Sequence, residues 1–577
     1  MNDNSAITAT AKTTVAHAVL ARLRAAGIEY FLANAGTDFP PLIEALSQAG
    51  EDGGNANGPQ TLVVPHENVA IAMAHGYAMI TGKPLAVMLH VNVGTSNAIC
   101  GLTNAYRTNI PLLLMAGRTP LTEHGTVASG TRSRHIHWAQ EMFDQAGMLR
   151  ELVKWDYEMR APEEANVVVD RALTLTQSGI QGPVYLSIPR EVLSAPAPAS
   201  SSAPLRSAPT GLAHPDPDQI AQAAEILLAA EHPLIITADV GRSTAAAGHL
   251  AALAERYAIP VITHVPRYLC LGNEHPMHLD YEPSPHLAQA DAVLVLDCDV
   301  PWIPATDPVH ASAKVIHLAQ DPLFSRYPVR GFPSQLSIAA DSVAALPLLD
   351  AAMAGADSVK VETRRTQVAE ARLKVRDRWQ GIRENARQAN PIHPAWLAQC
   401  VGEILGDDAI LVNEMGVVPQ HAGINRPGRY FGPSPAGGLG WGLGAALGAK
   451  LAAPDDLIVA TIGDGSYFFG NPMAAHYCAR AYDLPILFII VNNAGWGAVR
   501  RATKAMYPDG KALGGNDIPL SRLDPAPDYE QVIAACGGYG ERISDPAKLP
   551  DALARAVKLV VEERRQVLLN VIVSEVI

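Results

Sequence analysis

The stretch PLAVMLH (84–90) carries apolar side chains without polar alternation, and three similar runs lie near it: IEYFLAN (28–34), TLVVP (61–65) and PLLLMAG (111–117). Segments with helical spacing separate most of these runs. A strand that is apolar on both faces has to be covered on both faces, and strands that alternate with helices form parallel sheets. The first part of the chain therefore predicts a parallel sheet with helices on both sides.

The same alternation occurs twice more along the chain. In the middle part the apolar runs are PLIITA (233–238), IPVITH (259–264), AVLVLDCD (292–299) and KVIHLA (314–319). In the last part they are AILVNE (409–414), LIVATIGD (457–464), PILFIIVNN (485–493) and VLLNVIVS (567–574). We therefore expect an α/β protein with three doubly wound parallel-sheet domains.

Two stretches without this pattern mark the expected boundaries. LSAPAPASSSAPLRSAPT (193–210) is rich in Pro, Ala and Ser, which is typical of a linker, and a charged helical segment covers 359–388. The predicted division is a first domain over 1–192, a linker over 193–214, a central domain over 215–355, a helical connector over 356–394 and a last domain over 395–577.

The composition argues against several classes of protein. The 577 residues include 44 basic and 57 acidic ones, and the net charge of −13 argues against nucleic acid or an anionic membrane as the main partner. The longest apolar runs are too short to span a bilayer. The six cysteines form no C-x-x-C pair, and the first residues lack the features of a secretory signal. We expect a cytoplasmic enzyme that acts on small molecules.

The sequence GDGS (463–466) follows one of the apolar runs, and NN (492–493) follows the next. The two glycines allow a tight turn, so that N–H groups at a helix start can face a phosphate. Asp464 and Asn493 would place a carboxylate and an amide oxygen at neighbouring strand ends, and together with diphosphate oxygens they suit octahedral Mg²⁺. The alternative is that GDG is only a turn and that the asparagines only end a strand.

GDGS followed by NN resembles the cofactor-binding motif of thiamine-diphosphate-dependent enzymes. The resemblance extends over the whole chain, to the pyruvate decarboxylase/acetolactate synthase superfamily. PHENVAIAMAHGYA (65–78) is similar to its catalytic-glutamate segment, and VKWDYE (153–158) and GPVYLSIP (182–189) are similar to segments of benzoylformate decarboxylases. AGGLGWGLGAALGA (436–449) is similar to the glycine-rich segment that holds the aminopyrimidine. The superfamily implies a pyrimidine-binding, a middle and a diphosphate-binding domain.

For the aminopyrimidine, the resemblance implies that Glu67 bonds N1′, that the Gly437 carbonyl meets the 4′-amino group and that Leu439 supports the bent cofactor. Glu67 also has a physical rationale. Thiazolium C2–H is a weak carbon acid, and a buried carboxyl with a raised pKa shares its proton with N1′, which favours the imino form that deprotonates C2. The alternative for Glu67 is an acidic residue that complements a helix dipole.

For the other end of the cofactor, the resemblance implies that Asp464, Asn493 and the backbone carbonyl of Gly495 bind Mg²⁺. Gly465 and Ser466 would lie near the diphosphate. Members of the superfamily are dimers or tetramers in which the first domain of one chain faces the last domain of another. The resemblance therefore implies a homodimer or homotetramer with active sites between chains.

The substrate side combines features of two subfamilies. Thr37 in NAGTDFPPL lies where benzoylformate decarboxylases carry a serine, and Asp38 lies beside it. His90 in MLHVNVGTSNA is similar to the histidine of their LHS segment, which makes it an acid–base candidate, although a histidine at a strand end can also be structural. Gln140 in WAQE resembles the acetolactate synthase side, where a glutamine lines the site.

Other histidines are weaker candidates. His66 precedes the predicted catalytic glutamate, and its role stays ambiguous. In HIH (135–137), one-residue spacing without a third ligand favours surface histidines over a metal pair.

Three segments depart from the patterns of relatives. The segment around YFFGNP (467–472) is longer than usual, which predicts a reshaped helix start. After Asn413-Glu414 this chain has MGVVPQ (415–420) where benzoylformate decarboxylases carry several hydroxyls, so we expect different contacts there. LDCDVPWIPAT (296–306) lacks the arginine that flavin-containing relatives carry, and we therefore do not expect FAD.

Together these features predict an enzyme that uses thiamine diphosphate and Mg²⁺ to make or break a C–C bond next to the carbonyl of a 2-oxo acid. Loss of CO₂ would leave an enamine, which either takes a proton or, as in acetolactate synthase, attacks a second carbonyl. The alternatives are a benzoylformate-type simple decarboxylase, an acyloin or 2-hydroxyacyl-CoA lyase and, in a different class, a non-catalytic paralogue that binds the cofactor. Glu67, Asp464 and Asn493 together argue against the paralogue.

Overall fold

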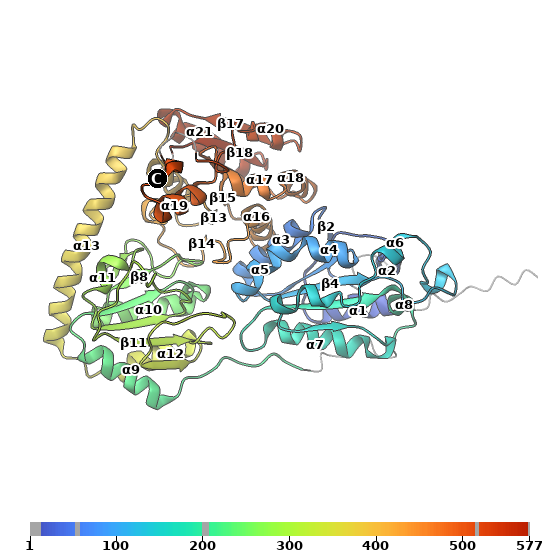
Figure 1. The fold of residues 1–577 in the computed structure, drawn as a ribbon, viewed down its shortest axis with the longest axis horizontal. Coiled ribbons are helices and arrows are strands. Elements are labelled where there is room, and N and C mark those ends of the chain that lie inside the picture. Colours follow the sequence, from blue (N-terminus) through green and yellow to red (C-terminus); the bar gives the residue numbers. More distant parts are fainter. Residues whose placement is uncertain (1–12, 52–57, 199–206, 514–517, 575–577) are drawn as a thin grey trace, which may run out of the picture. The chain divides into compact units, whose positions relative to one another are not determined.

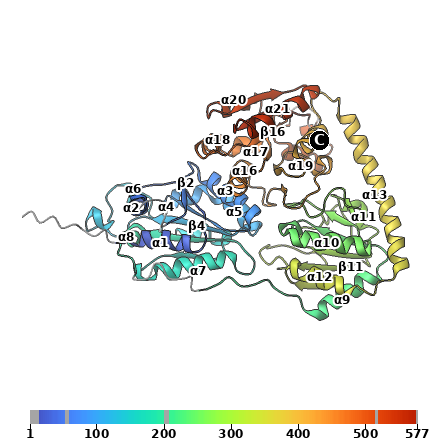
Figure 2. The ribbon, with the colours of Figure 1, turned by 180° about the vertical axis from the view of Figure 1, so that it is seen from behind.

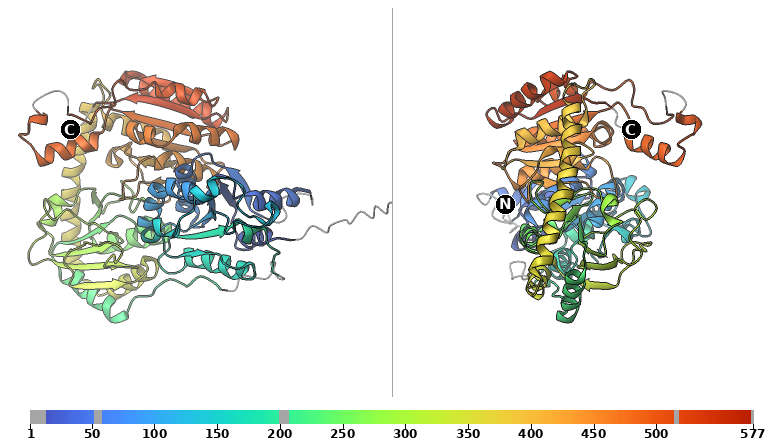
Figure 3. Two further views of the ribbon diagram at one scale, coloured as in Figure 1. Left: turned by 45° about the vertical axis from the view of Figure 1, so that its right-hand side comes forward. Right: turned by 90° about the vertical axis from the view of Figure 1, so that its left-hand side faces the viewer.

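The computed structural model describes residues 13–51, 58–198, 207–513 and 518–574 (Figure 1, Figure 2, Figure 3). The chain divides into two compact units. The first consists of Met1–Thr210 and Ser434–Gly438, and the second consists of Gly211–Pro433 and Leu439–Ile577. The first unit contains one parallel sheet and the second contains two.

The sheet of the first unit has six parallel strands in the order β2-β1-β3-β4-β6-β5. They are β1 (Tyr30–Ala33), β2 (Gln60–Val63), β3 (Leu85–Leu89), β4 (Leu112–Arg118), β5 (Asp156–Glu158) and β6 (Pro183–Pro189). The helices are α1 (Val15–Ala25), α2 (Pro40–Glu51), α3 (Glu67–Thr81), α4 (Val91–Asn97), α5 (Ile99–Arg107), α6 (Ile136–Ala139), α7 (Ala165–Gln177) and α8 (Arg190–Ser194). Met88 and Met115 pack in one core with residues of α1 and α7. A buried ion pair between Arg22 and Asp170 (2.6 Å) joins these two helices.

The first sheet of the second unit has the order β12-β11-β10-β7-β8-β9. Its strands are β7 (Pro233–Thr237), β8 (Val261–Thr263), β9 (His278–Asp280), β10 (Ala292–Leu296), β11 (Lys314–Ala319) and β12 (Leu336–Ala339), and its helices are α9 (Pro217–Ala229), α10 (Thr244–Tyr257), α11 (Ser284–Leu287) and α12 (Ser342–Ala352). The long helix α13 (Ser358–Ala386), yellow in Figure 1, follows. Its residues Val368, Val375 and Trp379 are buried in the cores around this sheet.

The second sheet of this unit has the order β14-β13-β15-β16-β18-β17. Its strands are β13 (Ile410–Glu414), β14 (Tyr430–Phe431), β15 (Ile458–Gly463), β16 (Leu487–Asn492), β17 (Tyr539–Ile543) and β18 (Val567–Ile572). The helices are α14 (Pro394–Leu405), α15 (Pro419–Ala422), α16 (Trp441–Ala452), α17 (Asp464–Phe469), α18 (Pro472–Ala481), α19 (Gly497–Met506), α20 (Tyr529–Ala534) and α21 (Leu549–Val561). Strand β16 is buried along its whole length, as expected for a central parallel strand.

The predicted fold class is confirmed, since the chain forms three parallel six-stranded sheets and each of the twelve apolar runs quoted for them overlaps a strand. Apart from β6, which coincides with the segment GPVYLSIP (182–189), five strands of the described residues have no counterpart in these predictions: β5, β9, β12, β14 and β17. All five lie at sheet edges. An edge strand is paired on one side only and is often short, so it does not need the long apolar run by which central strands are recognised.

One predicted boundary falls inside a helix. The predicted linker begins at Leu193, but α8 extends to Ser194 because Leu193 is fully buried in the core of the first unit. Residues 199–206 of the linker lie outside the described residues. The charged segment predicted over 359–388 is helical as α13, and the other domain boundaries stay predictions. Among the helices of the described residues, none is both long and apolar enough to cross a membrane.

Candidate active site

The carboxyl ends of β1, β2 and β3 meet at one edge of the first sheet, which is where parallel sheets usually bind ligands. A pocket of about 520 Å³ lies there, lined by Asn34, Ala35, Glu67, His90, Val93, Gly94, Ser96 and Asn97. Two residues predicted to be catalytic, Glu67 and His90, therefore share one pocket.

Glu67 is the first residue of α3 and is partly buried. Its Oε1 accepts a hydrogen bond from Nδ2 of Asn34 (2.8 Å), and its Oε2 accepts one from Nδ2 of Asn97 (2.6 Å). Both asparagines stand in stretches quoted above, but sequence reasoning missed them, because only the fold brings residues so far apart in the chain to one carboxylate. The two amides hold the carboxylate in a single orientation.

His90 is held by a buried carboxylate. Its Nδ1 lies 2.5 Å from Oδ1 of Asp38, whose side chain is 3% exposed. Two glycines make room for this pair: a Cβ at Gly36 would lie 2.1 Å from the His90 ring, and a Cβ at Gly117 would lie 1.7 Å from the Asp38 carboxylate. The sequence prediction placed Asp38 near the substrate; in the structure its carboxylate contacts Nδ1 of His90 and can orient the ring.

The structure brings Gln140 and His90 together. Gln140 follows α6, and its Nε2 lies 3.3 Å from Nε2 of His90. The decarboxylase-like histidine and the synthase-like glutamine are thus neighbours at one place. Thr37, by contrast, is exposed, and its backbone carbonyl accepts a hydrogen bond from Arg190 (3.2 Å).

The weaker histidine candidates differ in burial. His135 is exposed, but His137 is buried and its Nδ1 accepts a hydrogen bond from the backbone N–H of Ser133 (3.0 Å), so the prediction of surface histidines is wrong for His137. In the described parts of the chain, no group of three or more His, Cys, Asp or Glu side chains is arranged to hold a metal ion. Burial lowers the pKa of His66, and the nearby Glu67 opposes this effect.

In the second unit, the predicted Mg²⁺ ligands converge on one backbone group. Asp464 begins α17 at the carboxyl end of β15, and Asn493 follows β16. Oδ2 of Asp464 and Oδ1 of Asn493 both accept a hydrogen bond from the Gly495 N–H, each at 3.1 Å. Burial raises the pKa of Asp464 to about 6. A carboxylate and an amide oxygen aimed at one point fit a hard cation such as Mg²⁺, which does not require three carboxylates.

The longer segment around YFFGNP contains the end of one helix and the start of the next. The short helix α17 ends at Phe469, and Asn471 has a positive φ of 53° before α18 begins at Pro472. At the start of α17, a Cβ at Gly465 would lie 2.4 Å from the Trp496 ring, so this position requires glycine.

Glu414 is a buried residue of this site whose role sequence reasoning missed. Its Oε1 accepts hydrogen bonds from the N–H groups of Gly440 (2.9 Å) and Trp441 (3.3 Å), and its Oε2 accepts one from Gly442 (2.6 Å). Burial raises the pKa of Glu414 to about 7, while these N–H donors and Ser466 oppose the shift. The expectation of different contacts concerned residues 415–420 and did not identify Glu414, for which the signal in the sequence was no more than a glutamate at a strand end.

The glutamate thus anchors the start of α16, directly after the glycine-rich turn that contains the predicted cofactor residues Gly437 and Leu439. Gly437 has a positive φ of 67°, which glycine adopts without strain. The division between the two compact units falls between Gly438 and Leu439.

Comparisons with known proteins agree with this geometry. Three family profiles match: "Thiamine pyrophosphate enzyme, N-terminal TPP binding domain" at residues 13–148, the central domain at 220–346 and the C-terminal TPP binding domain at 414–571. Benzoylformate decarboxylase of Pseudomonas aeruginosa is 28% identical over 79% of this chain and 82% of its own length. Acetolactate synthase isozyme 3 large subunit of Escherichia coli is 25% identical over 87% of this chain and 86% of its own length.

Solved structures show the same fold. The 4-hydroxybenzoylformate decarboxylase of Rhodococcus jostii RHA1 superposes with a TM-score of 0.77 at 23% identity, over 97% of this chain and 99% of that one. The fold and the two strand-end clusters define a cofactor-dependent α/β enzyme with three parallel-sheet domains. The chain belongs to the thiamine-diphosphate-dependent enzymes, in the 2-oxo acid decarboxylase and carboligase family.

Proposed function

We propose that this enzyme decarboxylates a 2-oxo acid and joins the remaining carbon unit to a second carbonyl compound. The observation that carries the proposal is the contact between His90 and Gln140 (3.3 Å), next to the pocket that also contains Glu67. A histidine suits proton transfer to and from the substrate, and a held amide beside it suits orientation of a second carbonyl group.

The residues at the third sheet fit the diphosphate end of the cofactor and Mg²⁺. Asp464 and Asn493 offer side-chain oxygens that already point to one N–H group, and the backbone carbonyl of Gly495 would be the third protein ligand. Gly465 and Ser466 would lie near the diphosphate. Since Mg²⁺ prefers oxygen ligands in octahedral geometry, the diphosphate would supply further ligands.

Glu67, Gly437 and Leu439 would hold the aminopyrimidine. When bound, thiamine diphosphate supplies a nucleophilic C2 atom and a cationic ring that takes up the electron pair released with CO₂. Glu67 would share a proton with the ring nitrogen N1′, and the amides of Asn34 and Asn97 hold its carboxylate in place.

His90 would move a proton on the substrate side. Because the Asp38 carboxylate accepts a hydrogen bond from Nδ1–H, the neutral ring presents Nε2 as its basic atom. Thr37, which is exposed, would contribute from the loop after β1.

A second candidate is a simple decarboxylase of the benzoylformate type. The His90–Asp38 pair favours it, because a histidine that has taken up a proton at Nε2 and returns it to the substrate completes decarboxylation without a second carbonyl. An acyloin or 2-hydroxyacyl-CoA lyase and a cofactor-binding paralogue without activity are two further candidates, and neither has a contact of its own in its favour.

A substrate panel distinguishes these functions. Purified protein with thiamine diphosphate and Mg²⁺ is incubated with 2-oxo acids, alone and with added aldehydes, and CO₂, aldehydes and 2-hydroxyketones are measured. We expect CO₂ together with 2-hydroxyketones. Aldehyde as the sole organic product would support the simple decarboxylase, cleavage of acyloins without CO₂ would support the lyase, and no turnover with any substrate would support the paralogue.

We also propose a homodimer or homotetramer with active sites between chains, as the family resemblance implies. Glu67 and Asp464 belong to different compact units, which is compatible with a site completed by a second chain. Light scattering combined with activity measurements tests this, and a fully active monomer would contradict it.

The central domain is proposed to bind no FAD. At the carboxyl edge of its sheet, the buried Arg267 forms ion pairs with Asp239 (2.5 Å) and Asp299 (3.1 Å), so its charge is already neutralised and is not offered to a phosphate. Absorbance near 450 nm after flavin incubation and gel filtration tests this. We also propose that the protein is cytoplasmic, which cell fractionation tests.

A further inference from the structure

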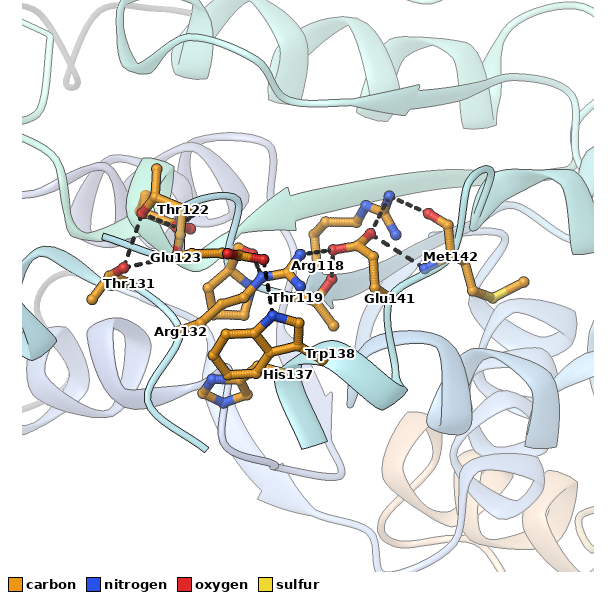
Figure 4. Close-up of polar contacts among 12 residues, drawn as sticks. Arg118, Thr119, Thr122, Glu123, Thr131, Arg132, His137, Trp138, Glu141 and Met142 are labelled. Atoms are coloured by element: carbon orange, nitrogen blue, oxygen red, sulfur yellow. Dashed lines mark hydrogen bonds and ion pairs between the residues drawn. The ribbon is translucent and has the colours of Figure 1, made fainter. Parts of the chain in front are cut away.

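We infer that Glu141 is a positioning residue, which holds Gln140 beside His90 and thereby arranges the substrate side of the pocket. The inference rests on the proposed function. Figure 4 shows the polar contacts around Glu141, in the segment that leads from β4 to Met142. The sequence does not predict a role for this glutamate, because its partners lie at three separate positions along that segment: 118–119, 132 and 142.

The Glu141 carboxylate forms ion pairs with both neighbouring arginines and accepts hydrogen bonds from Arg132 and from a buried hydroxyl (Figure 4). Its Oε1 lies 2.7 Å from Nη2 of Arg118, and its Oε2 lies 2.5 Å from Nη2 of Arg132. The hydroxyl of Thr119 donates to Oε2 (2.6 Å), and the backbone N–H of Met142 donates to Oε1 (3.2 Å). Four donors therefore surround one carboxylate.

The two arginines are themselves anchored. Arg118 is the last residue of β4, and it also contacts Glu158 (2.9 Å) and donates to the Met142 carbonyl (2.5 Å). Nε of Arg132 donates to the Pro120 carbonyl (2.8 Å). Both arginine side chains are about one-tenth exposed, so each charge depends on its carboxylate partners. Glu141 thus ties its segment to the rigid end of a central strand.

The consequence falls on the residue before it. Gln140 follows α6 directly, with its backbone N–H bonded to the Ile136 carbonyl (2.8 Å), and its side-chain amide lies 3.3 Å from His90. Because Asp38 accepts the Nδ1–H of His90, the free Nε2 of the ring accepts from the amide of Gln140. Glu141 therefore positions Gln140, which donates this hydrogen bond, and Asp38 positions His90, which accepts it.

The variant Glu141→Gln keeps the size of the side chain but removes its charge and turns an NH₂ group toward one of the donors. The matched control is Glu123→Gln in the same segment. Glu123 is exposed and accepts a single hydrogen bond from the Trp138 indole N–H (2.9 Å), which an amide oxygen also accepts. If Glu141→Gln does not fold, Thr119→Val removes one donor without changing the size of the side chain.

Hydrogen–deuterium exchange of the full-length protein without cofactor is the first measurement. We expect faster exchange of peptides within 119–142 in Glu141→Gln and no change in Glu123→Gln. Unchanged exchange in Glu141→Gln would overturn the inference. Since this measurement needs no turnover, it separates a failure of the inference from a failure of the proposed function, which the substrate panel detects.

The second measurement is a double-mutant cycle on kcat/KM for the accepted 2-oxo acid. We expect Glu141→Gln to lower it about 3- to 10-fold, the effect of losing one hydrogen bond, with thiamine diphosphate affinity unchanged. In the Gln140→Ala background, Glu141→Gln should have no further effect, because it acts through Gln140. Equal effects in both backgrounds, or a loss of cofactor affinity, would show that Glu141 does not act by positioning Gln140.

Discussion

Glu414→Gln should destabilise the start of α16 and weaken cofactor binding. In the wild type one buried carboxylate accepts N–H groups from three successive residues, Gly440, Trp441 and Gly442. Glutamine is nearly isosteric, but one of its two terminal atoms is an NH₂ group, and three donors then face a single acceptor. These N–H groups follow the turn that contains Gly437 and Leu439, so a shift there moves the residues proposed to hold the aminopyrimidine.

The magnitude follows from the geometry. The least costly orientation of the glutamine places its NH₂ group opposite the Gly442 N–H. This orientation leaves one buried donor unsatisfied, at a cost of about 1–3 kcal/mol. The remaining bonds to Gly440 and Trp441 also lose the strength that a charged acceptor provides, while the uncharged side chain has less to lose on burial. Because the raised pKa of Glu414 shows that burying the charge costs more than these bonds return, the uncharged side chain offsets part of the loss, and we expect a net loss of at most about 1–3 kcal/mol in the free energy of unfolding.

Calorimetry of the cofactor-free protein at pH 8 measures this effect, because the carboxyl is ionised above its pKa of about 7. For a domain of this size, the expected loss lowers Tm by about 2–10 °C. Glu403→Gln on the exposed face of α14 is the control and should change Tm little. A Glu414→Gln protein with the Tm and the thiamine diphosphate affinity of the wild type would refute the reasoning.

Three further substitutions test the proposed roles. Asp464→Ala should abolish Mg²⁺-dependent binding of thiamine diphosphate, and normal affinity in calorimetry would contradict the metal assignment. Glu67→Gln should keep the fold and most cofactor affinity but slow C2–H/D exchange, measured by NMR after acid quench, because an amide cannot exchange a proton with N1′; exchange at the wild-type rate would return Glu67 to a structural role. His90→Ala should leave cofactor affinity intact and lower turnover by about 10²–10⁴-fold, and unchanged turnover on the true substrate would remove it from the mechanism.

The central strands were predictable because burial on both faces leaves a strong trace in the sequence. Runs such as the one containing Leu113 and Met115 cannot be solvent-exposed, so they predict strands without knowledge of their partners. Edge strands leave no such trace: β17, with the sequence YGERI, has one buried residue, and only its pairing with β18 makes it a strand.

The candidate site was predictable where a family motif specifies it and not where the partner comes from elsewhere in the chain. Glu67, His90 and Asp464 stand in recognisable motifs. Their partners are Asn34 for Glu67 and Asp38 for His90, and no local spacing marks these pairs, because 33 and 52 residues separate their members. Asp38 shows this difference: its motif suggested a place near the substrate, and only the fold reveals that its carboxylate contacts Nδ1 of His90.

These partners share a physical purpose. The side chains of Glu67 and His90 are held by residues from other parts of the chain: the amide of Asn97 holds Glu67, and the carboxylate of Asp38 holds His90. Gln140 is held through the neighbouring Glu141 and its ion pair with Arg118. Side chains held in this way lose little freedom when substrate binds, which is what catalysis by positioned groups requires. Substitution of the holding residues should therefore change reaction rates and product ratios more than it changes the fold.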